Sequence, residues 1–392
     1  MRRRKFCQYA LGAACFVESS GRSLAFSTTA KSSFTKAHHK WVVLYWMPYD
    51  NNLSRFGEPI IEMIARGTQN SASAVAVQSD YWGDAHMRRR QVIGGIVTEI
   101  DISGEDSSDV SALASYLDWA YQAFEAEHWA VIVVGHGGKI NEISPDDHRV
   151  NHQPRTWMGV DQFTNVVDNF NQAVNGRVEL LFFQNCNKAT LEVIYEARNS
   201  ARYTLASQLT LGAPNYYYEN FLKRLTSLAN GREAAMAIID AERVDMYHTL
   251  TLVDNQAVEH LPEKLSSLLL TLLSDNLGEF NQSSDIPTYS YFDEKHCDVI
   301  ILLNHLSNVS NKGQREVAKF TDFINSSVIG AYQTNGELFG SFLRIDQNTL
   351  SQKLCGLGMY FPKTEQDISR YSTLALYQRI DLVNLYRLMI AG

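Results

Sequence analysis

The feature that most constrains the fold is a set of short runs that are apolar at almost every position. They stand at residues 41–47 (WVVLYWM), 128–134 (HWAVIVV) and 178–183 (VELLFF), and residues 73–79 are a fourth candidate. A strand with one face in water alternates apolar and polar residues, so a continuous apolar run is typical of a strand covered on both faces. The runs therefore predict a mostly parallel sheet with helices on both sides.

Amphipathic patterns between these runs supply the covering helices. Residues 109–124 place Leu113, Leu117 and Phe124 on one face, and Asp109 can cap the helix. The other predicted helices are 161–174, 188–199, 216–228, 231–243, 255–275 and 311–333, and the other predicted strands are 91–101, 201–208, 247–254 and 356–362. Strands that alternate with helices indicate an α/β fold.

The first 25 residues have the pattern of an export signal. A basic start, MRRRKF, precedes a short apolar run, and Ser23 and Ala25 are small residues where a signal peptidase would read them. Arg3-Arg4-Lys5-Phe6 also resembles a twin-arginine signal. The alternative is a basic amphipathic tail that is never removed. We therefore expect an exported protein, periplasmic or extracellular.

The remaining chain divides less clearly. The best candidate boundary is the polar stretch 275–287, and no internal repeat is present. The expected parts are a signal peptide at 1–25, a linker at 26–40, an α/β core at 41–254 and a C-terminal region at 255–392 that is helical, with a late strand completing the domain.

Removal of the signal would make an acidic chain more acidic. Five of the 35 basic residues and one of the 43 acidic residues would leave, which changes the net charge from −8 to −12. An acidic protein of this kind does not favour nucleic-acid binding. We expect no nucleic-acid partner, no membrane association after signal removal, and a monomer.

Three of the five cysteines would remain after the same cut, namely Cys186, Cys297 and Cys355. Cys297 and Cys355 could pair and leave Cys186 as the free thiol, but spacing alone does not supply the geometry. The sequence has no C-x-x-C, no H-E-x-x-H and no dense His/Cys cluster. We therefore expect no metal ligands.

Two of the predicted strands end in residues capable of covalent chemistry. His136 follows one apolar run in the turn G-H-G-G, and Cys186 follows another in Q-N-C-N. In α/β sheets the working residues lie beyond the carboxyl ends of the strands. A thiolate nucleophile needs a histidine to take its proton, and a helix that begins one or two residues after the cysteine would stabilise the thiolate.

We expect Cys186 and His136 to form a catalytic dyad, with the backbone N–H groups of Gly137 and Cys186 as the oxyanion hole. Their spacing of about 50 residues, histidine first, is that of caspases. The alternatives are a buried structural thiol and a histidine held in a glycine turn.

Five ordered motifs extend this interpretation. WVVLYWMPYDNNL (41–53) resembles an apolar strand leading to A-D-N-N-L, VIVVGHGG resembles a strand followed by H-G-G, and FFQNCNKATLEVIYEAR (182–198) resembles F-D-A-C-L-M-x-x-x-E-V-A-Y-E-L-R. Ala206-Ser207-Gln208 matches A-S-Q or A-S-E, and GLGMYFP (356–362) matches G-L-S-I-Y-F-P. These motifs are those of the clostripain family of cysteine peptidases, which the chain resembles over residues 40–390.

The resemblance implies a caspase-like fold, a mostly parallel sheet flanked by helices with a helical C-terminal extension. It also implies a secreted cysteine endopeptidase that acts on peptide or protein substrates. The candidate substrate-binding residues are Gln184, Asn185, Ser207, Gln208 and Asn215. Gln184 and Asn185 could instead support their loop, and Asn215 could be a turn residue. Asp50 and Asn51 are expected to fix the first strand-end turn.

The chain departs from the family at two places that bear on specificity. Gln184 replaces the family's aspartate two residues before the cysteine, and the turn 209–218 has no acid before Glu219. The family's preference for cleavage after Arg or Lys therefore does not carry over to this chain from these residues. A polar or otherwise noncationic residue before the scissile bond is compatible with them, and the sequence does not determine which residue is preferred. The rival functions are an inactive peptide-binding relative and a cysteine amidase or transpeptidase. No cofactor is predicted, and calcium, which some family members bind, cannot be derived from this sequence.

Overall fold

The structure is a computed structural model that describes residues 36–104, 106–148, 150, 152–274, 286–308, 310–336, 344–345 and 354–391. The predicted signal peptide, most of the predicted linker and residues 275–285 of the predicted boundary lie outside the described residues.

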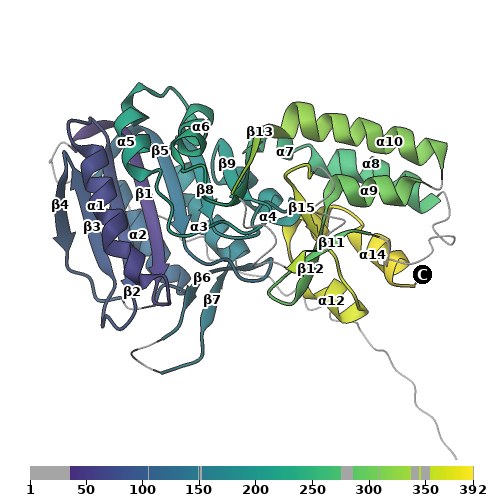
Figure 1. Ribbon diagram of the computed structural model, residues 1–392, viewed down its shortest axis with the longest axis horizontal. Helices are drawn as coiled ribbons and strands as arrows, with labels where there is room; N and C mark the ends of the chain where they lie inside the picture. Colours follow the sequence, from purple (N-terminus) through teal and green to yellow (C-terminus); the bar gives the residue numbers. More distant parts are fainter. Residues whose placement is uncertain are drawn as a thin grey trace, which may run out of the picture.

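A nine-stranded sheet forms the larger part of the molecule (Figure 1). Its strand order is β13-β10-β9-β8-β5-β1-β2-β3-β4. The strands are β1 (His38–Tyr49), β2 (Ala74–Tyr81), β3 (Arg88–Ile93), β4 (Ile96–Ile100), β5 (Glu125–Val134), β8 (Val178–Gln184), β9 (Tyr203–Ser207), β10 (His248–Asp254) and β13 (Ile329–Asn335). The five central strands, β9 to β2, are mutually parallel, and antiparallel strands extend the sheet on both edges. The predicted α/β fold is confirmed.

Strand β1 shows why its sequence is apolar throughout. Val42, Leu44 and Trp46 belong to one hydrophobic cluster, whereas Val43 and Tyr45 belong to the cluster on the opposite face. Successive side chains of a strand point to opposite faces, so both faces of β1 must be covered. Each fully buried aliphatic side chain of this kind contributes about 1.5–3 kcal/mol to folding.

Two groups of helices cover the two faces. One face packs against α2 (Val110–Ala123), α3 (Val160–Ala173) and α4 (Leu191–Glu196). The other face packs against α1 (Gly57–Thr68), α5 (Tyr218–Arg224) and α6 (Gly231–Ala241). A small hairpin, β6 (Glu142–Asp146) with β7 (Thr156–Gly159), stands beside the sheet.

The chain after residue 254 is helical but also contains strands. Its helices are α7 (Asn255–Val258), α8 (Leu261–Ser274), α9 (Val299–Ser307), α10 (Asn311–Phe323), α12 (Glu365–Arg370), α13 (Ala375–Arg379) and α14 (Leu382–Ala391). A second, antiparallel sheet has the order β14-β11-β12-β15, formed by β11 (Thr288–Tyr291), β12 (Glu294–Asp298), β14 (Arg344–Ile345) and β15 (Gly358–Tyr360). The late strand β15 thus pairs with β12, and it touches the larger part through a bridge between Gly358 and Thr190.

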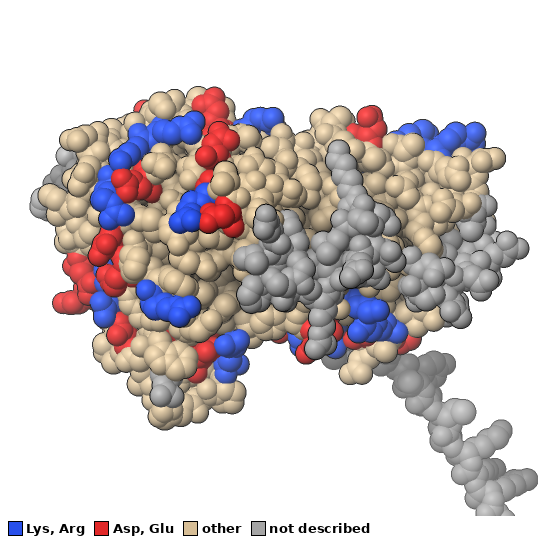
Figure 2. Space-filling model, viewed as in Figure 1, with Lys and Arg blue, Asp and Glu red and all other residues tan. Residues whose placement is uncertain are grey.

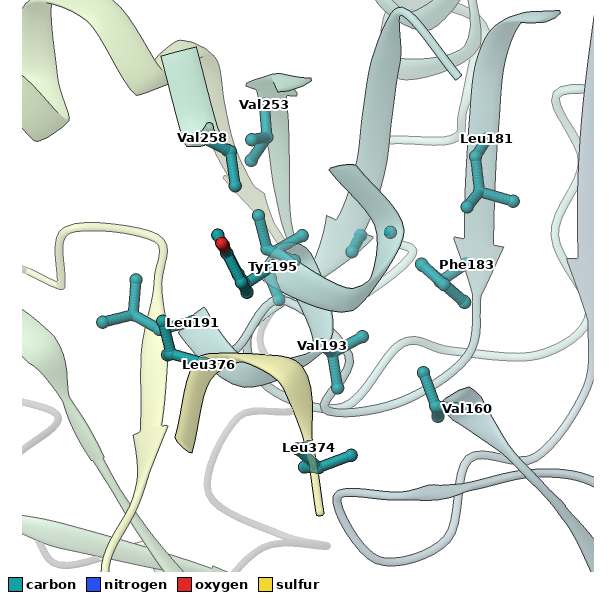
Figure 3. Close-up of a cluster of buried hydrophobic side chains, with 14 of the residues drawn as sticks. Val160, Leu181, Phe183, Leu191, Val193, Tyr195, Val253, Val258, Leu374 and Leu376 are labelled. Carbon is teal, nitrogen blue, oxygen red and sulfur yellow. The ribbon is translucent and has the colours of Figure 1, made fainter. Parts of the chain in front are cut away.

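One hydrophobic cluster crosses the expected division at residue 254. Figure 3 shows Leu191 and Val193 of α4 beside Leu374 and Leu376 of the C-terminal region. All four side chains are buried. The C-terminal region therefore covers the helix that follows Cys186. The expected boundary at residue 254 stays a prediction.

Several predicted elements differ from the structure. The helix predicted at 311–333 ends in a π-helical turn, Ile324–Val328, after which the chain becomes strand β13. The strand predicted at 91–101 lies in the hairpin β3–β4, whose turn contains Gly94 and Gly95 with positive φ. The helix predicted at 255–275 is broken between α7 and α8.

Basic and acidic side chains are intermixed on the face shown in Figure 2. Over the larger part several of them form ion pairs, such as Arg66 with Glu219 and Arg88 with Asp84. Among the described helices, none has the length and apolar character needed to cross a membrane.

Candidate active site

The ends of β5 and β8 bring His136 and Cys186 to the same edge of the sheet. The two strands are parallel neighbours, with Val134 opposite Gln184 in the register. His136 and Cys186 each follow two residues later. The structure therefore places the predicted dyad residues at matching positions on adjacent loops.

The two loops touch through Gly137. A Cβ atom on Gly137 would lie 2.4 Å from the carbonyl oxygen of Cys186 and 3.0 Å from Cε of Lys188. Contacts shorter than 3 Å require the surrounding backbone to move, so this close approach needs glycine. The predicted oxyanion donors, the N–H groups of Gly137 and Cys186, thus come from segments in van der Waals contact.

Asn185 ties the two loops together. Its Nδ2 donates to the carbonyl oxygens of Gly135 at 2.9 Å and His136 at 3.3 Å. The side chain is buried, and both acceptors belong to the histidine loop. Of the two roles considered for Asn185, these bonds favour loop support.

The Cys186 thiol is half-buried and faces the backbone of Leu211. The N–H of Leu211 donates to Sγ at 3.4 Å, and Sγ lies 3.6 Å from the Leu211 carbonyl oxygen. The hydroxyl of Tyr291 is also within hydrogen-bonding reach of the thiol. Burial raises the pKa of the Cys186 thiol, and the contacts with Leu211, Tyr291 and Lys188 oppose that rise.

The prediction that a helix begins within two residues of Cys186 is wrong. Helix α4 begins at Leu191, with Thr190 as its N-cap. Asn187 has a positive φ of 55°, and the N–H groups of Lys188 and Ala189 both donate to the Ser207 carbonyl oxygen. Because these residues are bound to the end of β9, the helix cannot start earlier, and its dipole acts on the thiol from farther away.

The imidazole of His136 is held by a residue that the sequence reasoning did not single out. Its Nε2 lies 2.7 Å from Oδ1 of Asn52. Asn52 follows Asp50 and Asn51 in the first strand-end turn, so the run D-N-N was the available signal. Asn51 itself fixes that turn as predicted, because its side chain bonds to Pro48 and Leu53.

The surroundings of His136 favour a neutral imidazole. Burial lowers the pKa of His136, the nearby Arg155 lowers it further, and Asp147 raises it. Arg155 and Asp147 form an ion pair with each other. In the described structure the hydrogen bonds of His136 and Cys186 go to other groups and not to one another, which is common before substrate binds.

Gln184 is buried with its amide fully bonded. Nε2 donates to Oδ1 of Asn215 and to the Tyr218 hydroxyl, both at 2.7 Å, and Oε1 accepts from the Tyr217 hydroxyl at 2.6 Å. Asn215 is buried beside it and bonds in turn to the Glu242 carboxylate. The predicted substrate roles of Gln184 and Asn215 therefore stay predictions, and a direct contact would need these bonds to rearrange.

Glu242 is an acidic residue beside the turn 209–218 that the sequence reasoning missed, because it lies far from that turn in the chain. It follows α6 in the chain, and its carboxylate accepts from the backbone N–H groups of Tyr216 and Arg243. The turn 209–218 contains no acidic residue of its own, but its Tyr216 N–H bonds to the Glu242 carboxylate. Glu242 is 7% exposed, and burial raises its pKa.

Ser207 and Gln208 lie at the end of β9 and are buried. The Ser207 hydroxyl lies 3.0 Å from the Thr249 hydroxyl, and Nε2 of Gln208 donates to Asp298 at 3.0 Å. The backbone carbonyl of Ser207 holds the segment after Cys186, as described above. Their predicted contact with substrate stays a prediction.

One group of residues in the described chain has the composition of a metal site. Asp106, Asp146 and His148 could each offer one ligand atom within 4.8 Å of the others. However, His148 already bonds through its ring to Asp146 and Thr156, and Asp146 accepts from Ser107 and from the His148 N–H. The polar atoms of His148 and Asp146 are thus already hydrogen-bonded within the protein, and we do not assign a metal site to this group.

In the described chain, the other two cysteines bond to neither His136 nor Cys186. Cys297 and Cys355 are both free thiols, and each faces a backbone carbonyl, that of Met359 and that of Leu357. The pairing that the sequence left open is therefore not formed in this structure.

The chain has recognisable relatives. A sequence model of the Clostripain family matches residues 45–381. A secreted C11 cysteine protease from Bacteroides thetaiotaomicron, solved with an irreversible peptide inhibitor, is similar in structure, with 14% identity, a TM-score of 0.65, and coverage of 88% of this chain and 99% of that one.

An inactive zymogen C11 protease from Parabacteroides distasonis gives the same identity, TM-score and coverage. A second structure of a secreted Bacteroides thetaiotaomicron C11 protease, named iotapain, has 12% identity, a TM-score of 0.61, and coverage of 87% of this chain and 99% of that one. Identities this low show a shared fold. No curated protein matches the sequence.

Proposed function

The chain belongs to the clostripain family of cysteine peptidases, and from this premise we propose that it is an endopeptidase whose dyad is Cys186 and His136. The observation that carries the proposal is the matched position of these residues, each two residues beyond adjacent parallel strands. The contact of Gly137 with the Cys186 backbone supports it.

The histidine takes the proton through Nδ1. Nε2 lies beside the Asn52 amide oxygen, which can only accept, so Nε2 carries the hydrogen and Nδ1 of the neutral ring is the acceptor. His136 removes the thiol proton of Cys186, and the thiolate attacks the scissile carbonyl carbon. The electron pair of the C=O bond moves to oxygen, where the N–H groups of Gly137 and Cys186 stabilise the charge.

The imidazolium then returns its proton to the leaving amine. The C–N bond breaks, the amine departs, and an acyl-thioester remains on Cys186. Water attacks this thioester with His136 again as base, which releases the carboxylic acid and regenerates the thiol. A small rotation of the His136 and Cys186 side chains, which bond elsewhere in the described structure, has to precede the first step.

We propose that the residue before the scissile bond is uncharged. The position of the family's aspartate is held by the neutral Gln184, which is bonded to neutral partners. Glu242, which bonds to this turn at Tyr216, is buried, and its carboxylate accepts from backbone N–H groups. A peptide library tests this, and cleavage confined to Arg and Lys would contradict it.

A variant pair tests the nucleophile. Cys186→Ala should abolish cleavage of the same library, whereas Cys355→Ala, which removes a half-buried thiol elsewhere, should leave it unchanged. Cleavage by the Cys186→Ala protein would refute the dyad. If the wild type cuts no peptide and only binds it, the inactive peptide-binding function is correct instead.

We further propose that the protein is exported by the segment 1–25, whose sequence has a basic start and a short apolar run. N-terminal sequencing of the protein from the periplasm or medium should begin at Phe26. Recovery of an intact Met1 form from the cytoplasm alone would exclude export.

A further inference from the structure

A lysine is buried two residues after the candidate nucleophile. Lys188 is 0% exposed, and its Nζ donates to three successive carbonyl oxygens of the histidine loop, those of Gly138 (3.4 Å), Lys139 (2.7 Å) and Ile140 (3.3 Å). Lysine is almost never fully buried without a specific reason. In the family motif given above, this position is a methionine, so the charge is a feature of this chain.

Lys188 completes a set of three side chains that hold the histidine loop. Asn185 binds the carbonyls of residues 135 and 136, the Tyr291 hydroxyl donates to that of Gly137 at 2.6 Å, and Lys188 binds those of 138–140. All six consecutive carbonyls therefore have a partner. Asn185 and Lys188 flank Cys186, and Tyr291 comes from the second sheet.

The amide groups of residues 138–140 in the same loop are bound as well. Gly138 N–H donates to the Glu142 carbonyl, Lys139 N–H to the Glu142 carboxylate, and Ile140 N–H to the Glu294 carboxylate. Within the described chain, Gly137 N–H is the amide of residues 137–140 that has no acceptor. The bonding that fixes the loop thus leaves free the Gly137 N–H, one of the two donors proposed for the oxyanion hole.

Within the described residues, Lys188 forms no direct ion pair. In the described part of the chain, its hydrogen-bond partners are carbonyls, and the charged or titratable groups that face it are Glu142 of β6, Glu294 and His296 of β12, and Cys186. Burial lowers the pKa of Lys188 to about 8, and Glu294, Glu142 and Cys186 raise it. An ammonium in so dry a place interacts strongly with a thiolate that forms nearby.

We propose that Lys188 is a positioning residue for the proposed hydrolysis, which holds the histidine loop through three carbonyls and stabilises the Cys186 thiolate by its charge. This inference rests on the proposed function for its catalytic meaning, but the effect on the thiol is a property of the folded chain alone. A lysine that only filled the core would hold the loop without changing the ionisation of Cys186.

The test is the pH dependence of alkylation of Cys186 by iodoacetamide, followed by mass spectrometry so that Cys297 and Cys355 are counted separately. Lys188→Met keeps the length of the side chain and removes the charge. The alkylation midpoint is the pH at which the rate of alkylation of Cys186 reaches half its maximum. In Lys188→Met this midpoint should rise by about one pH unit. Lys295→Met, which removes a charge from the neighbouring strand β12 outside these bonds, is the matched control and should leave the midpoint unchanged.

A second variant weakens the charge of Lys188 and keeps its side chain. Glu294→Gln removes a negative charge that faces Lys188, while its amide oxygen can still accept from Ile140 N–H and Tyr371 can bond to the amide nitrogen. Because Glu294 raises the pKa of Lys188, the ammonium loses its proton at lower pH in this variant, and the alkylation midpoint of Cys186 should rise by about half a pH unit. This variant also decides the question if Lys188→Met does not fold.

A Lys188→Met protein with native thermal stability and an unchanged midpoint would overturn the proposal, as would a Glu294→Gln midpoint that stays constant or falls. Peptide cleavage is measured separately. If the midpoints shift as expected but the wild type cuts no peptide, the endopeptidase function fails and the thiol effect stands. If the wild type cuts peptides and the midpoints do not move, only the role of Lys188 fails.

Discussion

The two loops that meet at the candidate site are built in opposite ways. The histidine loop, residues 135–140, contains three glycines and offers backbone carbonyls and the N–H of Gly137. The cysteine loop, residues 184–190, offers side chains, and Gln184, Asn185 and Lys188 are all buried and bonded. One loop is therefore shaped by the other, and the histidine is positioned by residues that flank the cysteine.

The strongest way to break this arrangement is to separate the loops. Gly137→Ala would place a Cβ atom 2.4 Å from the Cys186 carbonyl oxygen, so the backbone must move. We expect kcat/KM to fall about 100-fold or more, because small displacements of catalytic groups have effects of this size. Stability should fall by about 1–3 kcal/mol. Peptidase kinetics and denaturant unfolding measure both.

Gly104→Ala is the matched control, since its Cβ would meet only the flexible end of Met87 at 3.3 Å. It should change kcat/KM by less than twofold. A Gly137→Ala enzyme with wild-type kcat/KM would show that the close contact of the loops has no catalytic importance.

A milder change removes the Asn185 side chain, which bonds the two loops together, and leaves the contact between Gly137 and the Cys186 backbone in place. Asn185→Ala leaves the Gly135 and His136 carbonyls without their donor, which should lower stability by about 1–3 kcal/mol. We expect kcat/KM to fall about tenfold, because the histidine then samples more positions.

The comparison for this variant is Asn171→Ala. Asn171 also bridges two backbone groups, the Asn199 carbonyl and the Val178 N–H, but it lies away from the site. A similar loss of stability without a change in kcat/KM is expected there. Equal kcat/KM values for the two variants would mean that Asn185 acts on stability alone.

The smallest effect concerns the charge beside the histidine. Arg155 lowers the pKa of His136 and Asp147 raises it. Because Arg155→Gln removes the positive charge and leaves the negative one, the pKa of His136 should rise by less than about one unit. The acid limb of the kcat/KM profile, where the histidine becomes protonated and inactive, should move to higher pH. Asp147→Asn should move it to lower pH, and shifts of the same sign in both variants would contradict the assignment of His136 as the base.

The two loops also differ in how far they could be predicted. His136 and Cys186 were predictable because each follows an apolar run, and parallel strands bring their ends to one edge. Tyr291 and Glu242 were not, because they reach the site from other parts of the fold. Lys188 was visible in the sequence, but a lysine beside a loop is normally solvated, and only the three carbonyls explain its burial.

The same difference between local and distant contacts decides which strands could be predicted from the sequence. The central strands β1, β5 and β8 were predictable because burial on both faces removes polar residues from them. Strand β13 was misread as the end of a helix, since its residues Ile329–Asn335 are only half-covered and do not alternate clearly. Its pairing with β10, which is distant in sequence, decides its conformation.

The central claim is that Cys186 is activated by His136 across the two loops. The most direct measurement is labelling by a thiol-reactive peptide ketone at neutral pH, with the modified residue located by mass spectrometry in the wild type and in His136→Ala. We predict one adduct on Cys186 in the wild type and at least a 100-fold slower reaction in the variant. Labelling of another residue, or an equal rate in both proteins, would contradict the account.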